Sequence, residues 1–221
     1  MVSSNWLDLV QRYRAFAVIR SPHLQLGHQM ARAVAAGGMG LIEITWNGDR
    51  PTDLIAQLRQ DLPHCLIGAG TLLTLADMQE AIAAGAQFLF TPHTSPELIQ
   101  RAGAAGIPMI PGALSPTEIM TAWQAGAACV KVFPIQAVGG SAYITALQGP
   151  LGQIPLIPTG GVTIANTPEL LRAGAVAVGL AGDLFPRTAI QTGDWDIVQA
   201  RATTLMTHIR DGMNRPPTGW D

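Results

Sequence analysis

Eight short apolar runs recur along the chain, and their regular spacing is its most informative feature. Each interval of about 20 to 26 residues leaves room for one helix and its turns, which is typical of repeated βαβ units. Runs such as 16–19 and 177–180 are almost continuously apolar, as expected for parallel strands covered by helices. The runs begin near Phe16, Leu41, Leu66, Phe88, Pro108, Cys129, Pro155 and Ala175.

Glycines and capping residues mark the ends of the helices between these runs. Ser115 stands three residues before Glu118, and Asn166 stands three before Glu169, which predicts two capping boxes. Ser95 predicts a simpler N-cap. Five helices are expected to end at an Ala-Gly pair, with the glycine in the left-handed conformation: Ala36-Gly37, Ala84-Gly85, Ala105-Gly106, Ala125-Gly126 and Ala173-Gly174.

Eight such units predict an α/β fold, a (β/α)₈ TIM barrel with an extra N-terminal helix. We expect one domain over residues 1–221. Its parts are an N-terminal helix within 1–15, a barrel core over 16–190, and a C-terminal helix with an irregular tail over 191–221. A helix over Asn5 to Arg14 would carry an apolar stripe that covers the bottom of the barrel. A doubly wound open sheet has a similar local pattern, but its GxGxxG fingerprint is absent after the first run.

Composition excludes several classes of function. The chain is 48% hydrophobic, which excludes disorder, and no apolar run reaches the roughly 18 residues of a membrane helix. Its net charge of −2, without a basic run, offers no surface for nucleic acid. Cys65 and Cys129 form no CxxC motif or disulfide framework, which fits a reducing compartment. We therefore expect a cytoplasmic protein whose partner is a small molecule.

Among the 13 basic residues, Lys131 is the one lysine, so it carries the only side-chain primary amine. Successive side chains of a strand alternate between its faces. Cys129, Lys131 and Phe133 therefore share one face, and Val130 and Val132 share the other. If the valines face the helices, Lys131 points into the barrel.

The same alternation applies to the second run. There Ile42 and Ile44 form the natural helix-facing pair, which places Glu43 on the interior face with Leu41 and Thr45. A buried lysine or glutamate is costly unless it is paired or used in chemistry. Two groups of opposite charge are thus expected inside one barrel.

Two interpretations of this pair remain open from the residues alone. Lys131 could be structural, either in an ion pair with Glu43 or as a cap on carbonyl groups at the end of its strand. Alternatively, burial disfavours the ammonium form of Lys131 and leaves some free amine to attack a carbonyl, while Glu43 moves protons. Arginine serves everywhere else in the chain, and it could form an ion pair but could not act as an amine nucleophile, which favours the second interpretation.

Barrel active sites lie at the carboxyl ends of the strands, where the loops supply candidate binding groups. The segment 68–71 ends the third run with two glycines and Thr71, and the glycines would let a substrate approach the backbone. The segments 159–161 and 179–182 end the seventh and eighth runs, the latter just ahead of an expected helix, as in phosphate-binding barrels. Arg20 is a candidate anion ligand, and His93 could line the site. The five histidines have no metal-binding spacing, so we expect no metal.

Six segments together resemble the 2-keto-3-deoxy-6-phosphogluconate (KDPG) and 4-hydroxy-2-oxoglutarate (KHG) aldolase family. The resemblance extends from Ala17 to Phe185 and keeps the order and spacing of the family. It implies a class I aldolase on a (β/α)₈ barrel, without a cofactor and usually assembled as a homotrimer. The segments are Ile42-Glu43-Ile44-Thr45, Gly68-Ala69-Gly70-Thr71, Thr91-Pro92-His93, Ile110-Pro111-Gly112, Val130-Lys131-Val132-Phe133-Pro134 and Pro158-Thr159-Gly160-Gly161-Val162.

The resemblance also implies roles for individual residues. Lys131 would be the Schiff-base lysine and Glu43 the acid/base. The pyruvyl group would lie against Thr71, Pro92 and Phe133, and phosphate would bind at Gly160, Gly161, Ala181 and Gly182.

Two positions depart from the family pattern. Asn47 replaces a frequent arginine, as in the branch that acts on the galactonate epimer. Gly182 replaces a frequent serine, so phosphate would depend on backbone amides there.

We therefore expect cleavage of a KDPG-type acid to pyruvate and glyceraldehyde 3-phosphate, with KHG cleavage and oxaloacetate decarboxylation as side activities. Three alternatives use the same barrel. A metal-dependent pyruvate aldolase would lose activity in a chelator. A phosphosugar isomerase or epimerase would use Glu43 as a base without a covalent adduct. A non-catalytic metabolite-binding barrel would leave its ligands unchanged.

Overall fold

The computed structural model describes residues 5–213, in which strands and helices alternate as the apolar runs predict. None of the helices in this range is long and apolar enough to cross a bilayer. The strands are β1 (Ala15–Ile19), β2 (Leu41–Thr45), β3 (Leu66–Gly70), β4 (Leu89–Phe90), β5 (Met109–Ile110), β6 (Gly112–Ala113), β7 (Val130–Val132), β8 (Leu156–Pro158) and β9 (Val178–Leu180). The helices are α1 (Asn5–Tyr13), α2 (Leu24–Ala36), α3 (Pro51–Asp61), α4 (Leu75–Ala83), α5 (Pro96–Ala104), α6 (Pro116–Gln124), η1 (Ile135–Val138), α7 (Ser141–Leu151), α8 (Thr167–Arg172), α9 (Arg187–Thr192) and α10 (Trp195–Met213).

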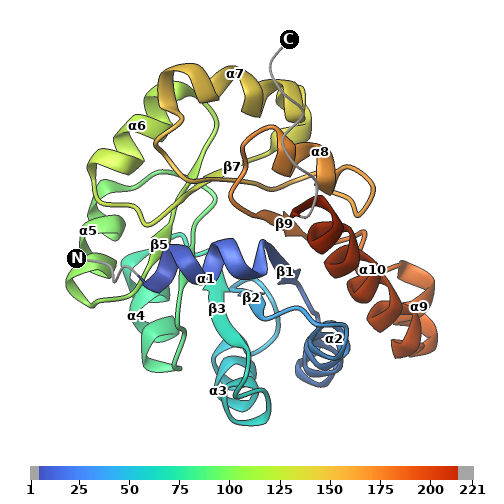
Figure 1. Ribbon diagram of the computed structural model, residues 1–221. Helices are drawn as coiled ribbons and strands as arrows, with labels where there is room; N and C mark the ends of the chain where they lie inside the picture. Colours follow the sequence, from blue (N-terminus) through green and yellow to red (C-terminus); the bar gives the residue numbers. More distant parts are fainter. Residues whose placement is uncertain (1–4, 214–221) are drawn as a thin grey trace.

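The strands close into a ring of eight parallel positions. Hydrogen bonding joins β5-β4-β3-β2-β1-β9 in one sheet and β6-β7-β8 in a second. Pro111, which has no amide hydrogen, separates β5 from β6, so these two short strands are one barrel position. A parallel bridge between Thr159 and Gly179 joins β8 to β9. The fold is therefore the predicted (β/α)₈ barrel, and the open-sheet alternative is wrong; Figure 1 shows the helices arranged around the strands.

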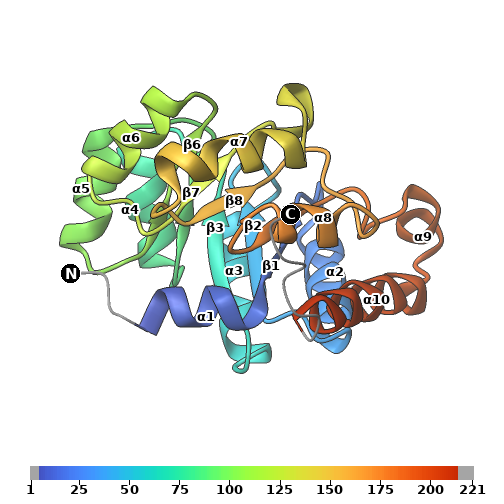
Figure 2. The same ribbon diagram turned by 45° about the horizontal axis from the view of Figure 1, so that its top comes forward.

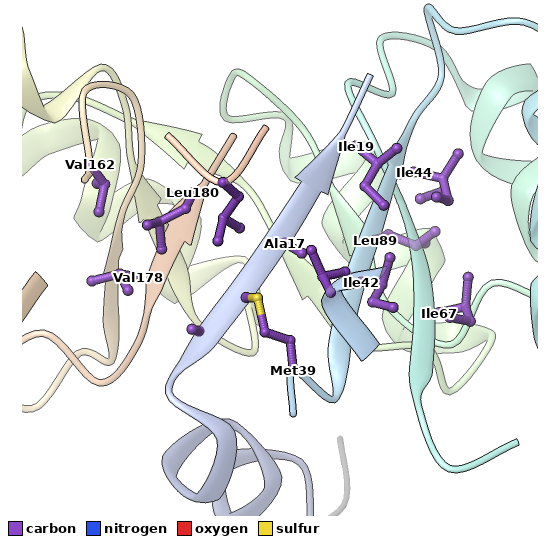
Figure 3. Packing of buried hydrophobic residues seen from close by; sticks show 14 of the residues in the cluster. Ala17, Ile19, Met39, Ile42, Ile44, Ile67, Leu89, Val162, Val178 and Leu180 are labelled. Carbon is purple, nitrogen blue, oxygen red and sulfur yellow. The ribbon is translucent and has the colours of Figure 1, made fainter. Parts of the chain in front are cut away.

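The buried apolar residues form two layers, one on each side of the strands. The outer layer lies between strands and helices and includes Ile42, Ile44, Val130 and Val132. Figure 3 shows Ile42 and Ile44 in this layer with their neighbours from the other strands. The inner layer fills the barrel and consists of Trp6, Val10, Phe16, Leu41, Phe88, Phe90, Ile110, Cys129, Ile157 and Ala177. The alternation predicted for β2 and β7 is therefore confirmed.

Helix α1 closes the end of the barrel at which the strands begin. Figures 1 and 2 show it lying across that end. Trp6 packs against Phe88 with ring centres 5.5 Å apart, and Phe16 packs edge-on against Phe88 at 5.4 Å. The predicted helix over Asn5 to Arg14 is thus present and ends at Tyr13. The irregular tail predicted from Arg215 lies outside the described residues.

Two of the predicted helix boundaries are wrong in detail, while Ser115 and Ser95 cap their helices as expected. Gly37 has an ordinary φ of −77°, and the following Gly38 is left-handed at 94°. Gly37 is needed instead because α10 packs directly on it.

Asn166 forms no capping box with Glu169. Its side-chain oxygen accepts a hydrogen bond from the Thr163 amide at 2.8 Å, and Glu169 accepts one from Ser141 at 2.5 Å. The Asn166 side chain is therefore engaged within its own loop and the Glu169 side chain with the first residue of α7, so the two form no capping box at α8.

The contact between α2 and α10 predicts the effect of Gly37→Ala. A Cβ there would lie 2.5 Å from the Cβ of Ala202 and 2.7 Å from the Gln199 carbonyl oxygen. We expect overpacking to lower the free energy of unfolding by about 1–3 kcal/mol in urea titrations. Gly103→Ala is the control, because Gly103 lies in α5 with no neighbour within 4 Å, and it should gain about 0.5–1 kcal/mol. Equal stabilities for the two variants would contradict this packing.

Candidate active site

Lys131 lies in the middle of β7 and its side chain enters the barrel. The residue is only 6% exposed, and it pairs in register with Gly112 of β6 and Ile157 of β8. Its Nζ lies 4.9 Å from the ring centre of Phe133 and 5.5 Å from that of Phe90. Aromatic faces attract a cation without offering a hydrogen bond. The amine is therefore buried against two aromatic rings that leave its hydrogens free to bond a ligand.

Glu43 is also buried inside the barrel, on β2, four positions around the ring from Lys131 by way of β8, β9 and β1. It is 1% exposed, and its Oε1 has no hydrogen-bond partner. Burial raises the pKa of this carboxyl above its ordinary value, against the opposing charges of Lys131 and Arg20. Within residues 5–213, no ion pair joins Lys131 to Glu43 within 4.0 Å. The structural ion pair is therefore absent, and both groups remain available.

The glycines of β3 make room for protein side chains and not for substrate, which corrects the expectation drawn from segment 68–71. A Cβ at Gly68 would overlap the ring of Phe88, and one at Gly70 would overlap the carboxyl group of Glu43. Gly70 is paired in register with Thr45, two residues beyond Glu43. The absence of a side chain at Gly70 thus gives Glu43 its place inside the barrel.

Thr45 is a buried polar residue that the sequence analysis did not single out. It is 1% exposed, and its hydroxyl has no hydrogen-bond partner. Alternation along β2 puts it on the face of Glu43, one step closer to the carboxyl end of the strand. The sequence analysis placed Thr45 on this face by alternation but gave it no role in the site.

The residues expected around the pyruvyl group lie just beyond the carboxyl ends of β3, β4 and β7. Thr71 follows β3 with a φ of 61°, a conformation that is uncommon for a residue with a side chain. Pro92 and Phe133 both line a pocket of about 360 Å³, and His93 lines it too. Phe133 is 36% exposed, so its ring lies between Lys131 and solvent-accessible space. The pocket therefore brings Pro92, His93 and Phe133 together, and the ring of Phe133 in turn contacts Lys131, which does not line the pocket.

The β8 loop presents two glycines whose carbonyl oxygens are already engaged. Gly160 and Gly161 have φ values of 86° and 84°. The carbonyl of Gly160 accepts a hydrogen bond from the Gln136 amide at 3.1 Å, and that of Gly161 accepts one from Asn166 Nδ2 at 3.0 Å. Among residues 5–213, the amides of Gly160 and Gly161 donate no backbone hydrogen bond. Free amides in such a loop can bind an anion.

The β9 loop lies beside the β8 loop, because Thr159 and Gly179 form a bridge. Ala181 and Gly182 are exposed there, and nothing lies within 4 Å of a Cβ built on Gly182. The expectation of a helix directly behind them is wrong. Residues 181–185 form a turn, and α9 begins only at Arg187. A phosphate at this place would therefore meet loop amides without the field of a helix N-terminus.

Arg20 and Asn47 are exposed on the loops that follow β1 and β2. The Asp49 amide donates a hydrogen bond to the Ser21 carbonyl at 3.0 Å and joins these two loops. The positive charge of Arg20 acts on Glu43 and partly offsets the rise that burial causes in the pKa of that carboxyl. Within the described range, no group of three His, Cys, Asp or Glu side chains could hold a metal ion.

A (β/α)₈ barrel that holds one buried amine and one buried carboxyl has the groups that a Schiff-base aldehyde lyase uses. The family model described as "KDPG and KHG aldolase" matches residues 8–201. The chain belongs to the KDPG and KHG aldolase family.

Individual relatives agree with this membership. The 2-dehydro-3-deoxy-phosphogluconate aldolase of Treponema pallidum is 34% identical over 193 residues, 87% of this chain and 92% of the relative. A KDPG aldolase from Legionella pneumophila, solved with pyruvate captured as a covalent carbinolamine intermediate, is 29% identical. It covers 90% of this chain and 97% of its own, with a TM-score of 0.83. A designed cage made by fusing symmetric oligomeric domains is 28% identical over 91% of this chain and 74% of its own, with a TM-score of 0.83.

The buried Glu43 predicts a pH-dependent stability. Because its pKa is raised by burial, the folded state holds the proton more tightly than the unfolded state, and stability falls as pH rises from the ordinary value of 4.5 through the raised one. Glu43→Gln has no such penalty. We expect its advantage in unfolding free energy to grow over that window, by at most about 1.4 kcal/mol per pH unit in urea titrations. A constant difference between the two proteins at every pH would contradict the raised pKa.

Proposed function

We propose that this protein is a class I aldolase that cleaves a 2-keto-3-deoxy-6-phospho sugar acid of the KDPG type to pyruvate and glyceraldehyde 3-phosphate. The observation that carries the proposal is the burial of the one lysine beside two aromatic rings, with an unpartnered carboxyl oxygen on Glu43 inside the same barrel. Family membership and the covalent pyruvate adduct of the Legionella relative support it.

The reaction begins with carbon–nitrogen bond formation. The neutral amine of Lys131 attacks the C2 carbonyl, and the resulting carbinolamine loses water to form an iminium ion. Glu43 takes the proton of the C4 hydroxyl, directly or through one water. The C3–C4 bond then breaks, its electron pair moves into the iminium to give an enamine, and C4 leaves as an aldehyde. Protonation of C3 and hydrolysis release pyruvate and restore Lys131.

The remaining candidate residues divide between the two ends of the substrate. Thr71, Pro92 and Phe133 would surround the pyruvyl end, which lies against Lys131. Arg20 and Asn47, on the joined loops after β1 and β2, would face the hydroxylated middle of the chain. The phosphoryl end would bind the loop amides of Gly160, Gly161, Ala181 and Gly182. The iminium supplies the electron sink, so the mechanism uses no cofactor and no metal.

Two further properties belong to the same proposal. A homotrimer is supported by the resemblance to the family and by the similarity to domains used as symmetric oligomers in the designed cage. A cytoplasmic location is supported by the two free, buried cysteines, Cys65 and Cys129.

Trapping with pyruvate and borohydride tests the covalent step. We expect mass spectrometry to find one reduced pyruvyl group, on the peptide that contains Lys131. Lys131→Arg is the matched control, because it keeps the positive charge and similar length but has no amine nucleophile, and it should lose both trapping and cleavage. An unmodified Lys131 in active enzyme, or full activity of Lys131→Arg, would contradict the proposal and favour an isomerase or epimerase.

A coupled lactate dehydrogenase assay tests the substrate class. We expect a higher kcat/KM for phosphorylated 2-keto-3-deoxy acids than for KHG, because the loop amides contribute binding energy only to the phosphoryl group. Chelator should change neither rate. The preferred epimer, gluconate or galactonate, reports on the environment of Asn47. Equal kcat/KM with and without the phosphoryl group would contradict the role given to the glycine loops.

A further inference from the structure

The turn that follows β9 contains Asp183, whose side chain reaches two other segments. Its Oδ2 accepts a hydrogen bond from the Ile164 amide of the β8 loop at 2.7 Å. Its Oδ1 accepts one from Arg201 Nη2 at 2.5 Å, and its backbone carbonyl accepts one from Arg201 Nε at 2.5 Å. One residue thus connects the β8 loop, the β9 turn and helix α10.

The partner of Asp183 is held firmly. Arg201 lies in α10, next to Ala202, which is fully buried where α10 packs against α2. The side chains of Arg201 and Asp183 are 35% and 27% exposed, so the pair is partly shielded from solvent. A guanidinium that binds both a carboxylate and a carbonyl fixes orientation as well as distance. Helix α10 therefore acts as a fixed support for the β9 turn.

The connection matters because backbone amides cannot adjust to a ligand by rotating a side chain. Gly182 directly precedes Asp183, and Gly161 lies three residues before Ile164. The distance between the two glycine loops is thus set by the segments that Asp183 joins. Arg201 also neutralises a carboxylate that would otherwise stand next to the place of a bound phosphoryl group and repel it.

We propose that Asp183 and Arg201 form a positioning pair that holds the two glycine loops at the spacing needed for the phosphoryl end of the substrate. The proposal rests on the proposed function, because it assumes that those loops bind the phosphoryl group. It assigns the pair no contact with the reacting carbons. It also gives α10 an indirect role in substrate binding. That role concerns the phosphoryl end of the substrate, far from the C2 carbonyl that Lys131 attacks.

Kinetics of Asp183→Asn and Arg201→Gln test the pair on the full-length protein. We expect KM for the phosphorylated substrate to rise about tenfold in Asp183→Asn, with kcat little changed. Arg201→Gln should raise KM further, because it leaves the Asp183 carboxylate without its counter-charge. Borohydride trapping with pyruvate, which has no phosphoryl group, should proceed at the wild-type rate in both variants. Asp61→Asn is the control, since it removes the pair between His28 and Asp61 on α2 and α3.

The outcomes separate this proposal from the proposed function. A rise in KM confined to the phosphorylated substrate supports the positioning pair. Unchanged KM in both variants would overturn it, as would an equal loss of phosphorylated-substrate cleavage and pyruvate trapping, which indicates a general loss of structure. If the wild-type protein itself does not trap pyruvate at Lys131, the proposed function is wrong. The positioning pair, which rests on that function, is then overturned with it, whatever the variants show.

Discussion

The proposed chemistry depends on keeping two ionisable groups, Lys131 and Glu43, buried in the interior of a barrel without letting them neutralise each other. A direct pair between Lys131 and Glu43 would use up both groups, and no such pair forms within residues 5–213. The ring of Phe133 and the ring of Phe90 shelter the amine, and Gly70 gives space to the carboxyl. Burial raises the pKa of Glu43, which suits a group that must carry a proton in one step and release it in another.

The two ends of the barrel serve opposite purposes. At the end where the strands begin, α1 covers the barrel through the apolar cluster of Trp6, Phe16 and Phe88. At the other end, the loops carry free amides, exposed polar side chains and an aromatic ring. In the proposed mechanism the closed end supplies rigidity, and the open end supplies binding. Arg201 and Asp183 extend this arrangement, because they connect a loop of the open end to a long, well-packed helix.

Much of the fold and of the site's core could be predicted from the sequence, for a physical reason. Strand alternation is a strict geometric rule, so the inward direction of Glu43 and Lys131 followed from the isoleucines and valines that flank each of them. Details that depend on tertiary contacts were out of reach. The pattern predicts Gly37 as a helix terminator, but a glycine is needed there because α10 packs against it. The pattern predicts a capping box for Asn166, but its side chain binds within its own loop. The connection through Asp183 links residues 18 and 19 positions apart, and no local pattern marks it.

A crystal structure of the protein soaked with pyruvate and then reduced tests the central claim most directly. The account predicts a continuous covalent bond from Lys131 Nζ to C2 of the pyruvyl group, with a carboxyl oxygen of Glu43 within hydrogen-bond distance of the adduct or joined to it by one water. Pyruvate bound without a covalent bond, or an adduct that Glu43 cannot reach, would contradict it.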